Sequence, residues 1–191
     1  MRRIKEKAAR LRRYPRGRGF GVQSPNDYNF ITKVVKGRLD ADCCSAANKE
    51  CSDLRCDNFK FVHLCYRVAQ YLNPSYCMCL VPKDENVRSY VVRAVPDVEL
   101  LDEMSDKPAE GRSLVILSPA EKYLMDTNEL LNKTTENMWM IIDGIRKTEE
   151  TYRLWQHITE DMRTRITFDL YHYGIICFDK KRYKQNYKIY L

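Results

Sequence analysis

Two short apolar runs constrain the fold of this chain more than any other feature. Ser113–Leu117 and Met138–Ile142 consist almost wholly of apolar residues. A strand that faces solvent on one side alternates apolar and polar residues, whereas a strand buried on both faces does not. Both runs are therefore predicted to be inner strands of a parallel sheet that carries helices on each side.

Further predicted strands and helices alternate along the chain with these two runs. Strands are predicted over 76–81, 98–101, 165–171, 174–178 and 187–191. The helical spacing of apolar residues and the capping residues at the ends predict helices over 24–37, 58–72, 84–95, 118–133 and 148–162. Such alternation is typical of βαβ units. The closeness of 165–171 to 174–178 predicts an antiparallel hairpin.

The predicted fold class is α/β, a three-layer Rossmann-like sandwich with a mostly parallel sheet, an antiparallel terminal hairpin and N-terminal helices. The length of 191 residues suits one structural domain. We divide the chain into a basic tail over 1–18, an N-terminal helical segment over 19–73 and an α/β core over 74–191. The second and third parts form one domain. Ligands in such sheets bind beyond the carboxyl ends of the strands.

The net charge of +7 is concentrated in the first eighteen residues. Nine lysines and arginines stand there against Glu6, so this stretch carries +8 and the remainder carries −1. A run of this kind is typical of a solubilising, partly disordered tail. The alternative is that Arg2–Arg18 binds the phosphates of nucleic acid.

Several classes of protein are disfavoured by what the sequence lacks. No stretch of about 18 apolar residues is present, so no membrane-spanning helix is expected. The basic start is not followed by the apolar region of a secretory signal. The eight cysteines are expected to be reduced thiols of a cytoplasmic protein. The spacing from Cys43 to Cys56 lacks the close pairs of a zinc site, so no metal is predicted.

Three segments of the chain are similar in sequence, and in their order along the chain, to segments of one protein family. They are G-F-G-V-Q-S-P at 19–25, I-I-D-G-I-R at 141–146 and R-I-T-F-D-L-Y-H-Y-G-I-I-C-F at 165–178. They resemble the opening, a late strand end and the terminal hairpin of a small bacterial family of class I S-adenosylmethionine (SAM)-dependent methyltransferase-like proteins. The resemblance implies a methyltransferase fold and SAM as the cofactor.

The cofactor loop departs from this family. The family ends its first strand in an acidic-Gly-x-Gly loop, whereas this chain reads L-V-P-K-D at 80–84. Side chains and a proline ring fill the space that glycine leaves open. By position alone, the resemblance implies cofactor-binding roles for Val81, Pro82, Lys83, Asp102, Glu103 and Ser118.

Two further departures concern the middle of the chain. A later strand of the family ends in I-D-G, but here it ends in Leu117-Ser118-Pro119, without that carboxylate. The link from Leu101 to Arg112 is short. The sheet is therefore predicted to lack one βα unit of the family.

Asp143 and His172 are the candidate catalytic residues. Asp143 follows a buried strand, where an α/β sheet presents functional groups, and it is a general base, a metal ligand or a loop cap that pairs with Arg146. His172 lies between the last two strands and is either a proton carrier or a structural residue.

These observations predict a methyltransferase-like protein whose SAM site has degraded, a pseudoenzyme with a binding or scaffolding role. Its partner is a small molecule or a protein that the sequence does not identify. One alternative is an active SAM-dependent methyltransferase of a small molecule with an atypical cofactor loop. Another is a nucleic-acid-associated protein that uses its basic tail. Fold resemblance does not decide between them, because one fold hosts many functions.

Overall fold

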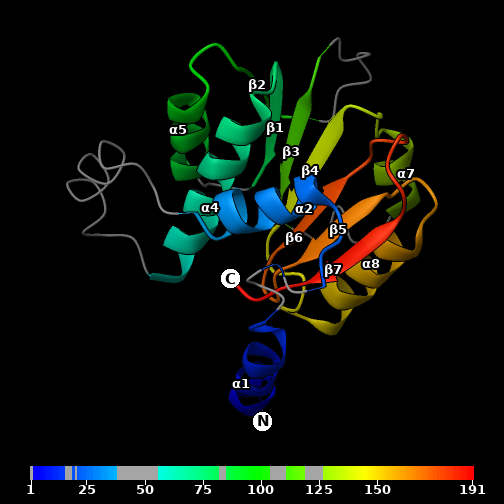
Figure 1. The fold of residues 1–191 in the computed structure, drawn as a ribbon. Helices are drawn as coiled ribbons and strands as arrows, with labels where there is room; N and C mark the ends of the chain where they lie inside the picture. The colour runs from blue at the N-terminus through cyan, green and yellow to red at the C-terminus, as the bar shows by residue number, and fades with distance from the viewer. Residues whose placement is uncertain are drawn as a thin grey trace.

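The computed structural model describes residues 2–15, 19, 21–37, 56–81, 85–103, 111–118 and 127–191. A seven-stranded sheet runs through the molecule, with helices on both faces (Figure 1). The strands are β1 (Tyr76–Leu80), β2 (Glu99–Leu101), β3 (Ser113–Leu117), β4 (Met138–Ile142), β5 (Ile166–Asp169), β6 (Gly174–Cys177) and β7 (Gln185–Lys188). The helices are α1 (Arg2–Arg13), α2 (Pro25–Asn29), the π-helical segment η2 (Phe30–Val35), α4 (Cys56–Leu72), α5 (Glu85–Ala94), α7 (Thr127–Asn132) and α8 (Glu149–Glu160).

The strand order across the sheet is β2-β1-β3-β4-β6-β5-β7. Strand β6 runs antiparallel to its neighbours β4 and β5, while the other pairings are parallel. The structure therefore has the predicted α/β class, with a mostly parallel sheet and a β5–β6 hairpin near its end. On one side the sheet ends at β2, and residues 104–110, which link β2 to β3, lie outside the described chain.

Two hydrophobic cores lie on opposite faces of the sheet. Leu114 and Ile116 of β3 belong to the core shared with η2, α4 and α5. Val115 and Leu117 of the same strand belong to the core shared with α7 and α8. All five residues of β3 are buried, so the apolar run without alternation corresponds to a strand covered on both faces, as predicted.

Capping residues fix where the main helices begin. The hydroxyl of Ser24 accepts a hydrogen bond from the Asp27 backbone N–H at 3.3 Å, and Pro25 occupies the first helical position of α2. Thr148 and Thr151 form a reciprocal capping box at the start of α8.

The hairpin approaches α8 closely at Gly174, the first residue of β6. A Cβ atom placed on Gly174 would lie 2.3 Å from the indole ring of Trp155. Trp155 is 3% exposed and packs in the core beneath α8. Glycine is therefore required at this position by close packing between strand and helix.

Several element boundaries differ from the sequence predictions. The helix predicted over 24–37 divides into α2 and η2, and the last strand starts at Gln185 rather than Tyr187. Of the helix predicted over 118–133, residues 119–126 lie outside the described chain, and α7 covers part of the remainder.

The N-terminal stretch differs most from expectation. The sequence predicts a partly disordered basic tail over 1–18, whereas the structure has a twelve-residue helix, α1, from Arg2 to Arg13. The physical reason is tertiary: Arg13 is 9% exposed and bonds residues near the end of the chain. Arg16, Gly17 and Arg18 lie outside the described residues.

Some classes of site find no counterpart in the described ranges. No helix there combines the length and apolar content that a membrane span needs. No three His, Cys, Asp or Glu side chains of the described residues gather in a way that could hold a metal ion. Cys65, Cys77, Cys79 and Cys177 are buried and are not in disulfide bonds, while Cys43, Cys44 and Cys51 lie outside the described chain.

Candidate functional site at the carboxyl edge of the sheet

The parallel strands end along one edge of the sheet, which we call the carboxyl edge. It holds the ends of β1, β2, β3, β4, β5 and β7 and, because β6 is antiparallel, the first residue of β6. Helix α1 lies beyond this edge, next to the C-terminus of the chain (Figure 1). A functional site in a sheet of this kind is expected here.

The strongest polar cluster at the carboxyl edge surrounds Asp169, the last residue of β5. Its carboxylate accepts hydrogen bonds from Arg13 at 2.8 and 3.3 Å and from Arg146 at 2.8 and 2.5 Å. The backbone N–H of Tyr171 donates to the same carboxylate at 2.9 Å. Arg13 also donates to the carbonyl oxygen of Ile189 at 3.2 Å. The cluster thus joins α1, the loop after β4, the hairpin and the C-terminal segment.

Burial makes this cluster important for stability. The Asp169 side chain is 6% exposed, and those of Arg13 and Arg146 are 11% and 20% exposed. Burial by itself would raise the pKa of Asp169, but the hydrogen bonds from Arg146 and Arg13 outweigh it and hold that pKa below its ordinary value. Asp169 is therefore a carboxylate at neutral pH, neutralised by two guanidinium groups.

Tyr171 adds aromatic contacts to the same cluster. Its backbone has a φ of 77°, a left-handed conformation that costs a residue with a side chain on the order of 1 kcal/mol. The guanidinium carbons of Arg13 and Arg146 lie 5.4 and 5.2 Å from the centre of its ring. Cation–π attraction from the two guanidinium groups offsets part of that backbone cost.

A second contact holds α1 beside the hairpin. The carboxylate Oε1 of Glu6 lies 3.0 Å from Nε2 of His172 and accepts a hydrogen bond from the hydroxyl of Tyr190 at 3.0 Å. His172, a candidate catalytic residue, is thus engaged by a side chain of the same chain. Burial, followed by the bond to Glu6, raises the pKa of Tyr190.

A pocket of about 510 Å³ opens beside this cluster. It is lined by Arg146, Lys147, Thr148, Glu149, Tyr152, Tyr171 and His172. Its lining combines cations, one acid and aromatic rings, and Arg146 lies 4.9 Å from the ring centre of Tyr152. The pocket borders the cluster but does not reach the carboxylate of Asp169, which its two arginines enclose.

The positions assigned to a cofactor lie further along the same edge. Arg88 of α5 forms an ion pair with Asp102 and donates to the carbonyl oxygen of Cys79 in β1 at 3.3 Å. Its guanidinium group therefore links the ends of β1 and β2. Asp102 and Glu103 are exposed.

Of the other four positions assigned to the cofactor, the structure describes Val81 and Ser118. Val81 is half-buried against the core beneath α4 and α5. The backbone N–H of Ser118 donates to the carbonyl oxygen of Leu80 at 3.4 Å, which continues the ladder between β1 and β3. Pro82 and Lys83 lie outside the described residues.

Asp143 and His172 lie on neighbouring loops of the carboxyl edge. The backbone N–H of Ile145 donates to the carbonyl oxygen of His172 at 3.0 Å, and Asp143 is half-buried. The sequence left open that Arg146 pairs with Asp143, and the structure shows the guanidinium of Arg146 bonded to the carboxylate of Asp169. The reason is the bidentate fit between Arg146 and a buried carboxylate at the end of the adjacent hairpin strand.

The residues that sequence reasoning missed are Asp169, Arg13, Glu6 and Tyr171. One signal for Asp169 was present, because it is a charged residue inside the apolar hairpin strand, and such residues are almost never buried unless paired. No sequence signal identified Arg13 as its partner, since their separation of 156 residues is bridged only by the fold.

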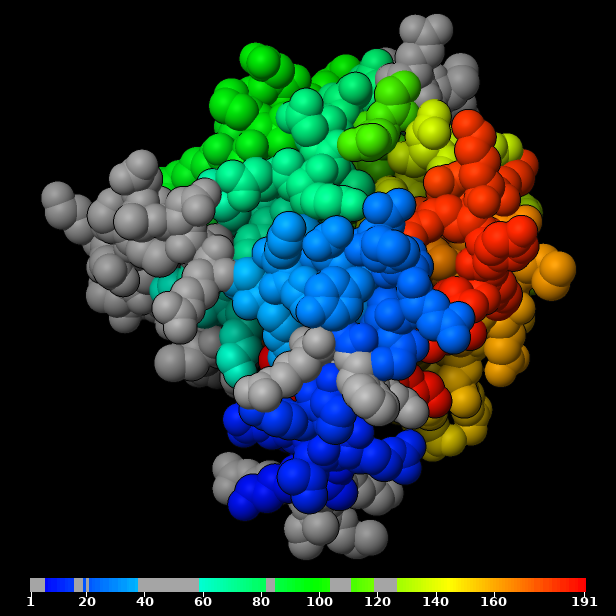
Figure 2. Space-filling view, viewed as in Figure 1, coloured from blue at the N-terminus to red at the C-terminus, as the bar shows by residue number. Residues whose placement is uncertain are grey.

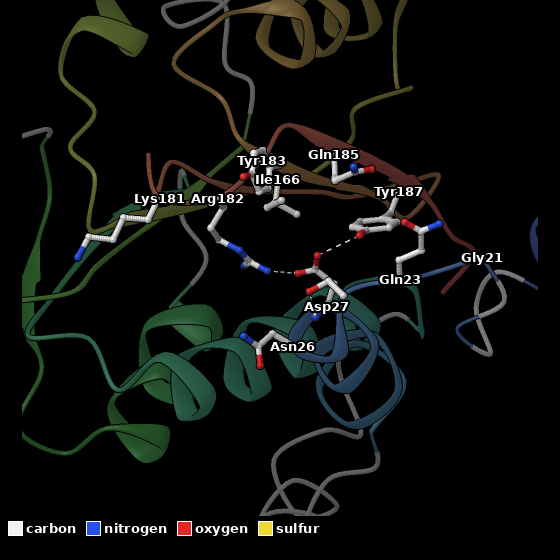
Figure 3. A pocket seen from close by; sticks show the side chains of 11 residues that line it. Gly21, Gln23, Asn26, Asp27, Ile166, Lys181, Arg182, Tyr183, Gln185 and Tyr187 are labelled. Atoms are coloured by element: carbon white, nitrogen blue, oxygen red, sulfur yellow. Dashed lines mark hydrogen bonds and ion pairs between the residues drawn. The ribbon is translucent and has the colours of Figure 1, made fainter.

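A second pocket, of about 580 Å³, lies near the starts of β5 and β7 (Figure 3). Asp27 of α2 is 2% exposed there, and Arg182 and Tyr187 both point toward its carboxylate. The Tyr187 hydroxyl donates to Asp27 at 2.9 Å, and burial together with this bond raises the pKa of Tyr187 to about 12. The contact joins the N-terminal helix pair to the last strand.

No known family model and no curated protein matches the chain. Among solved structures, the chain is similar to cofactor-bound Rv0187 from MTB, with 10% sequence identity and a TM-score of 0.41. The similarity covers 81% of this chain and 97% of that one. A likeness at this level carries no inference about function, so the interpretation of the site depends on this chain's own residues.

Proposed function

We propose that this chain is a non-catalytic binding protein on a methyltransferase-like fold whose SAM site has degraded. One observation carries the proposal: charged groups of the carboxyl edge are already bonded to side chains of the same chain. Asp169 is bonded to Arg13 and Arg146, and His172 to Glu6. Asp169 in particular is costly to release for a substrate, because a buried ion that loses its partner is strongly destabilised.

The cofactor end of the same edge supports the proposal. The resemblance assigns the ribose hydroxyls of SAM to an acid after the second strand, which here is Asp102 or Glu103. Asp102 is paired with Arg88, and the guanidinium of Arg88 also bonds β1. The residues after β1 contain no glycine that would let a cofactor approach the backbone. These residues do not fit a SAM site of the family's kind.

The alternative is an active methyltransferase of a small molecule, and one observation favours it. The pocket of about 510 Å³ beside His172 and Arg146 lies at the edge where such a substrate would bind. Asp143, after β4, also keeps the position that the resemblance implies for a site acid. Under this alternative both acids at strand ends, Asp102 and Asp143, take part in binding.

A thermal-shift experiment with SAM and S-adenosylhomocysteine separates the two functions. The proposal predicts no change in the melting temperature of the wild type at millimolar ligand. It also predicts no ligand-dependent difference between wild type and the variants Asp102→Ala and Asp143→Ala. A saturable rise in Tm for the wild type that both variants abolish would establish the methyltransferase alternative and reject the proposal.

A further inference from the structure

The first helix presents two different faces. Seven of the twelve residues of α1 are Lys or Arg, and Glu6 is its single acid. One face carries Glu6 and Arg13, which bond the hairpin and the C-terminal segment. Lys7 and Arg12 lie off this face and are exposed to solvent. Arg10 lies on the same face as Glu6 and Arg13, with its guanidinium carbon 5.8 Å from the ring centre of Tyr190, and is exposed as well. We infer that this exposed basic surface of α1 binds the phosphate backbone of nucleic acid.

The anchoring of α1 makes its charges a fixed surface. Arg13 is held by Asp169 and by the Ile189 carbonyl, and Glu6 is held by His172 and Tyr190. Figure 2 shows α1 standing out from the end of the molecule rather than folded into its body. A rigid helix loses little conformational freedom on binding, so its cations contribute more to affinity than those of a free tail.

The basic surface continues from α1 onto two other elements. Lys36, which follows η2, lies near Arg10 of α1 and near Lys60 of α4, and all three residues are exposed. The ammonium of Lys36 donates to the carbonyl oxygen of Tyr190. This partial removal from water, followed by repulsion from Arg10 and Lys60, lowers the pKa of Lys36. Two neighbouring cations therefore repel Lys36, and a polyanion bound at this surface would reduce that repulsion.

Phosphate backbone fits this surface better than a lipid membrane does. A helix that lies in a membrane surface needs an apolar face opposite its cations. In α1 the face with Glu6 and Arg13 is bonded to the body, and Leu11 is the exposed large aliphatic side chain among the residues of α1 whose side chains the structure describes. Tyr14 is 56% exposed at the end of the helix and offers a ring for stacking on a sugar or base.

The inference goes beyond the proposed function, which concerns the carboxyl edge and SAM. The test is fluorescence anisotropy with a labelled DNA duplex of mixed sequence, and with an RNA hairpin as a second probe, in a salt series. The full chain is expected to bind at least one probe with micromolar to sub-millimolar affinity at physiological salt, more tightly at low salt.

The test variant is the double substitution Lys7→Gln and Arg12→Gln, which leaves the anchoring residues intact. It is expected to raise Kd by about tenfold or more at low salt and to reduce the salt slope by about 2. The matched control is Lys180→Gln with Lys181→Gln. It removes the same charge from exposed lysines between β6 and β7, at the opposite end of the strands, and should leave Kd within about threefold of the wild-type value.

Each other outcome overturns the inference. Absence of binding to either probe does so directly. Equal weakening by both variants shows that net charge, and not the surface of α1, is responsible. Binding to vesicles of phosphatidylserine and phosphatidylcholine, without binding to DNA or RNA, assigns the surface to membranes instead. Circular dichroism confirms that both variants are folded. Because SAM is absent from the assay, failure here leaves the proposed function intact.

Discussion

Arg13 bonds the carboxylate of Asp169 through two guanidinium nitrogens, across 156 residues of chain. The contact joins the first helix to the β5–β6 hairpin, and Arg146 bonds the same carboxylate from the loop after β4. An α/β sheet usually binds its ligand at the carboxyl edge, but here side chains of the same chain form ion pairs with one another at that edge.

Replacement of Asp169 by Asn should destabilise the fold strongly, because Arg13 and Arg146 would lose their shared counter-charge. We expect a loss of about 3–5 kcal/mol in the free energy of unfolding, measured by urea denaturation. The matched control is Lys180→Gln, which breaks the exposed pair with Glu136 and should cost less than about 0.5 kcal/mol. Similar losses for the two variants would contradict a structural role for the Asp169 cluster.

The lowered pKa of Asp169 predicts how the free energy of unfolding depends on pH in the acidic range. Because folding lowers the pKa of Asp169, the unfolded state takes up a proton first as the pH falls. Its contribution should be complete above pH ~5 and should decline as the pH falls below the ordinary carboxyl pKa of about 3.9. The difference in unfolding free energy between wild type and Asp169→Asn should therefore shrink from pH ~6 to pH ~3. A difference that stays constant over this range would mean that folding does not lower the pKa of Asp169.

Two arginines one residue apart should differ in how they affect α1. Arg13→Gln removes the anchor to Asp169, whereas Arg12→Gln changes an exposed residue of the same helix. We expect the amide hydrogens of α1 to exchange about tenfold faster or more in Arg13→Gln, with little change in Arg12→Gln. Equal exchange in the two variants would mean that α1 is not held by this ion pair.

Alkaline pH should weaken the contact between Tyr187 and Asp27. Since folding raises the pKa of Tyr187 from about 10 to about 12, its contribution to stability is complete below pH ~10 and is lost as the pH rises toward 12. The Tyr187→Phe variant should not show this loss of stability at alkaline pH. At neutral pH its free energy of unfolding should be lower by about 1–3 kcal/mol, because buried Asp27 loses a hydrogen-bond donor. Tyr183→Phe, at a residue 89% exposed, is the control. An alkaline stability profile shared by Tyr187→Phe and wild type would contradict the assignment.

The sequence was most informative where secondary structure is set by burial on both faces. Ser113–Leu117 and Met138–Ile142 are strands with the predicted bounds, because a run of apolar residues in an α/β protein has few other places to lie. The ends of the hairpin strands moved by one to two residues, since backbone pairing, not side-chain pattern, determines where a strand stops. The helix in the basic stretch was not predicted, because seven like charges in twelve residues disfavour a helix without tertiary partners.

The sequence predicted that candidate residues lie at the carboxyl edge, but it did not predict which side chains pair with one another there. Position at the strand ends follows from topology, so Asp143 and His172 were found at the carboxyl edge. The pairing of Asp169 with Arg13 depends on contacts between distant segments, which no local pattern records. Likewise, Arg88 belongs to an ordinary helical pattern, and only the fold reveals that it reaches from β1 to Asp102.

The central claim is that the carboxyl edge does not receive SAM, and the measurement that tests it most directly is isothermal titration calorimetry. The wild-type protein is titrated with SAM and, separately, with S-adenosylhomocysteine, at neutral pH. We expect no heat of binding for either ligand up to millimolar concentration. Saturable binding of one ligand per chain at micromolar concentration would contradict it and would show that a working cofactor site lies at this edge.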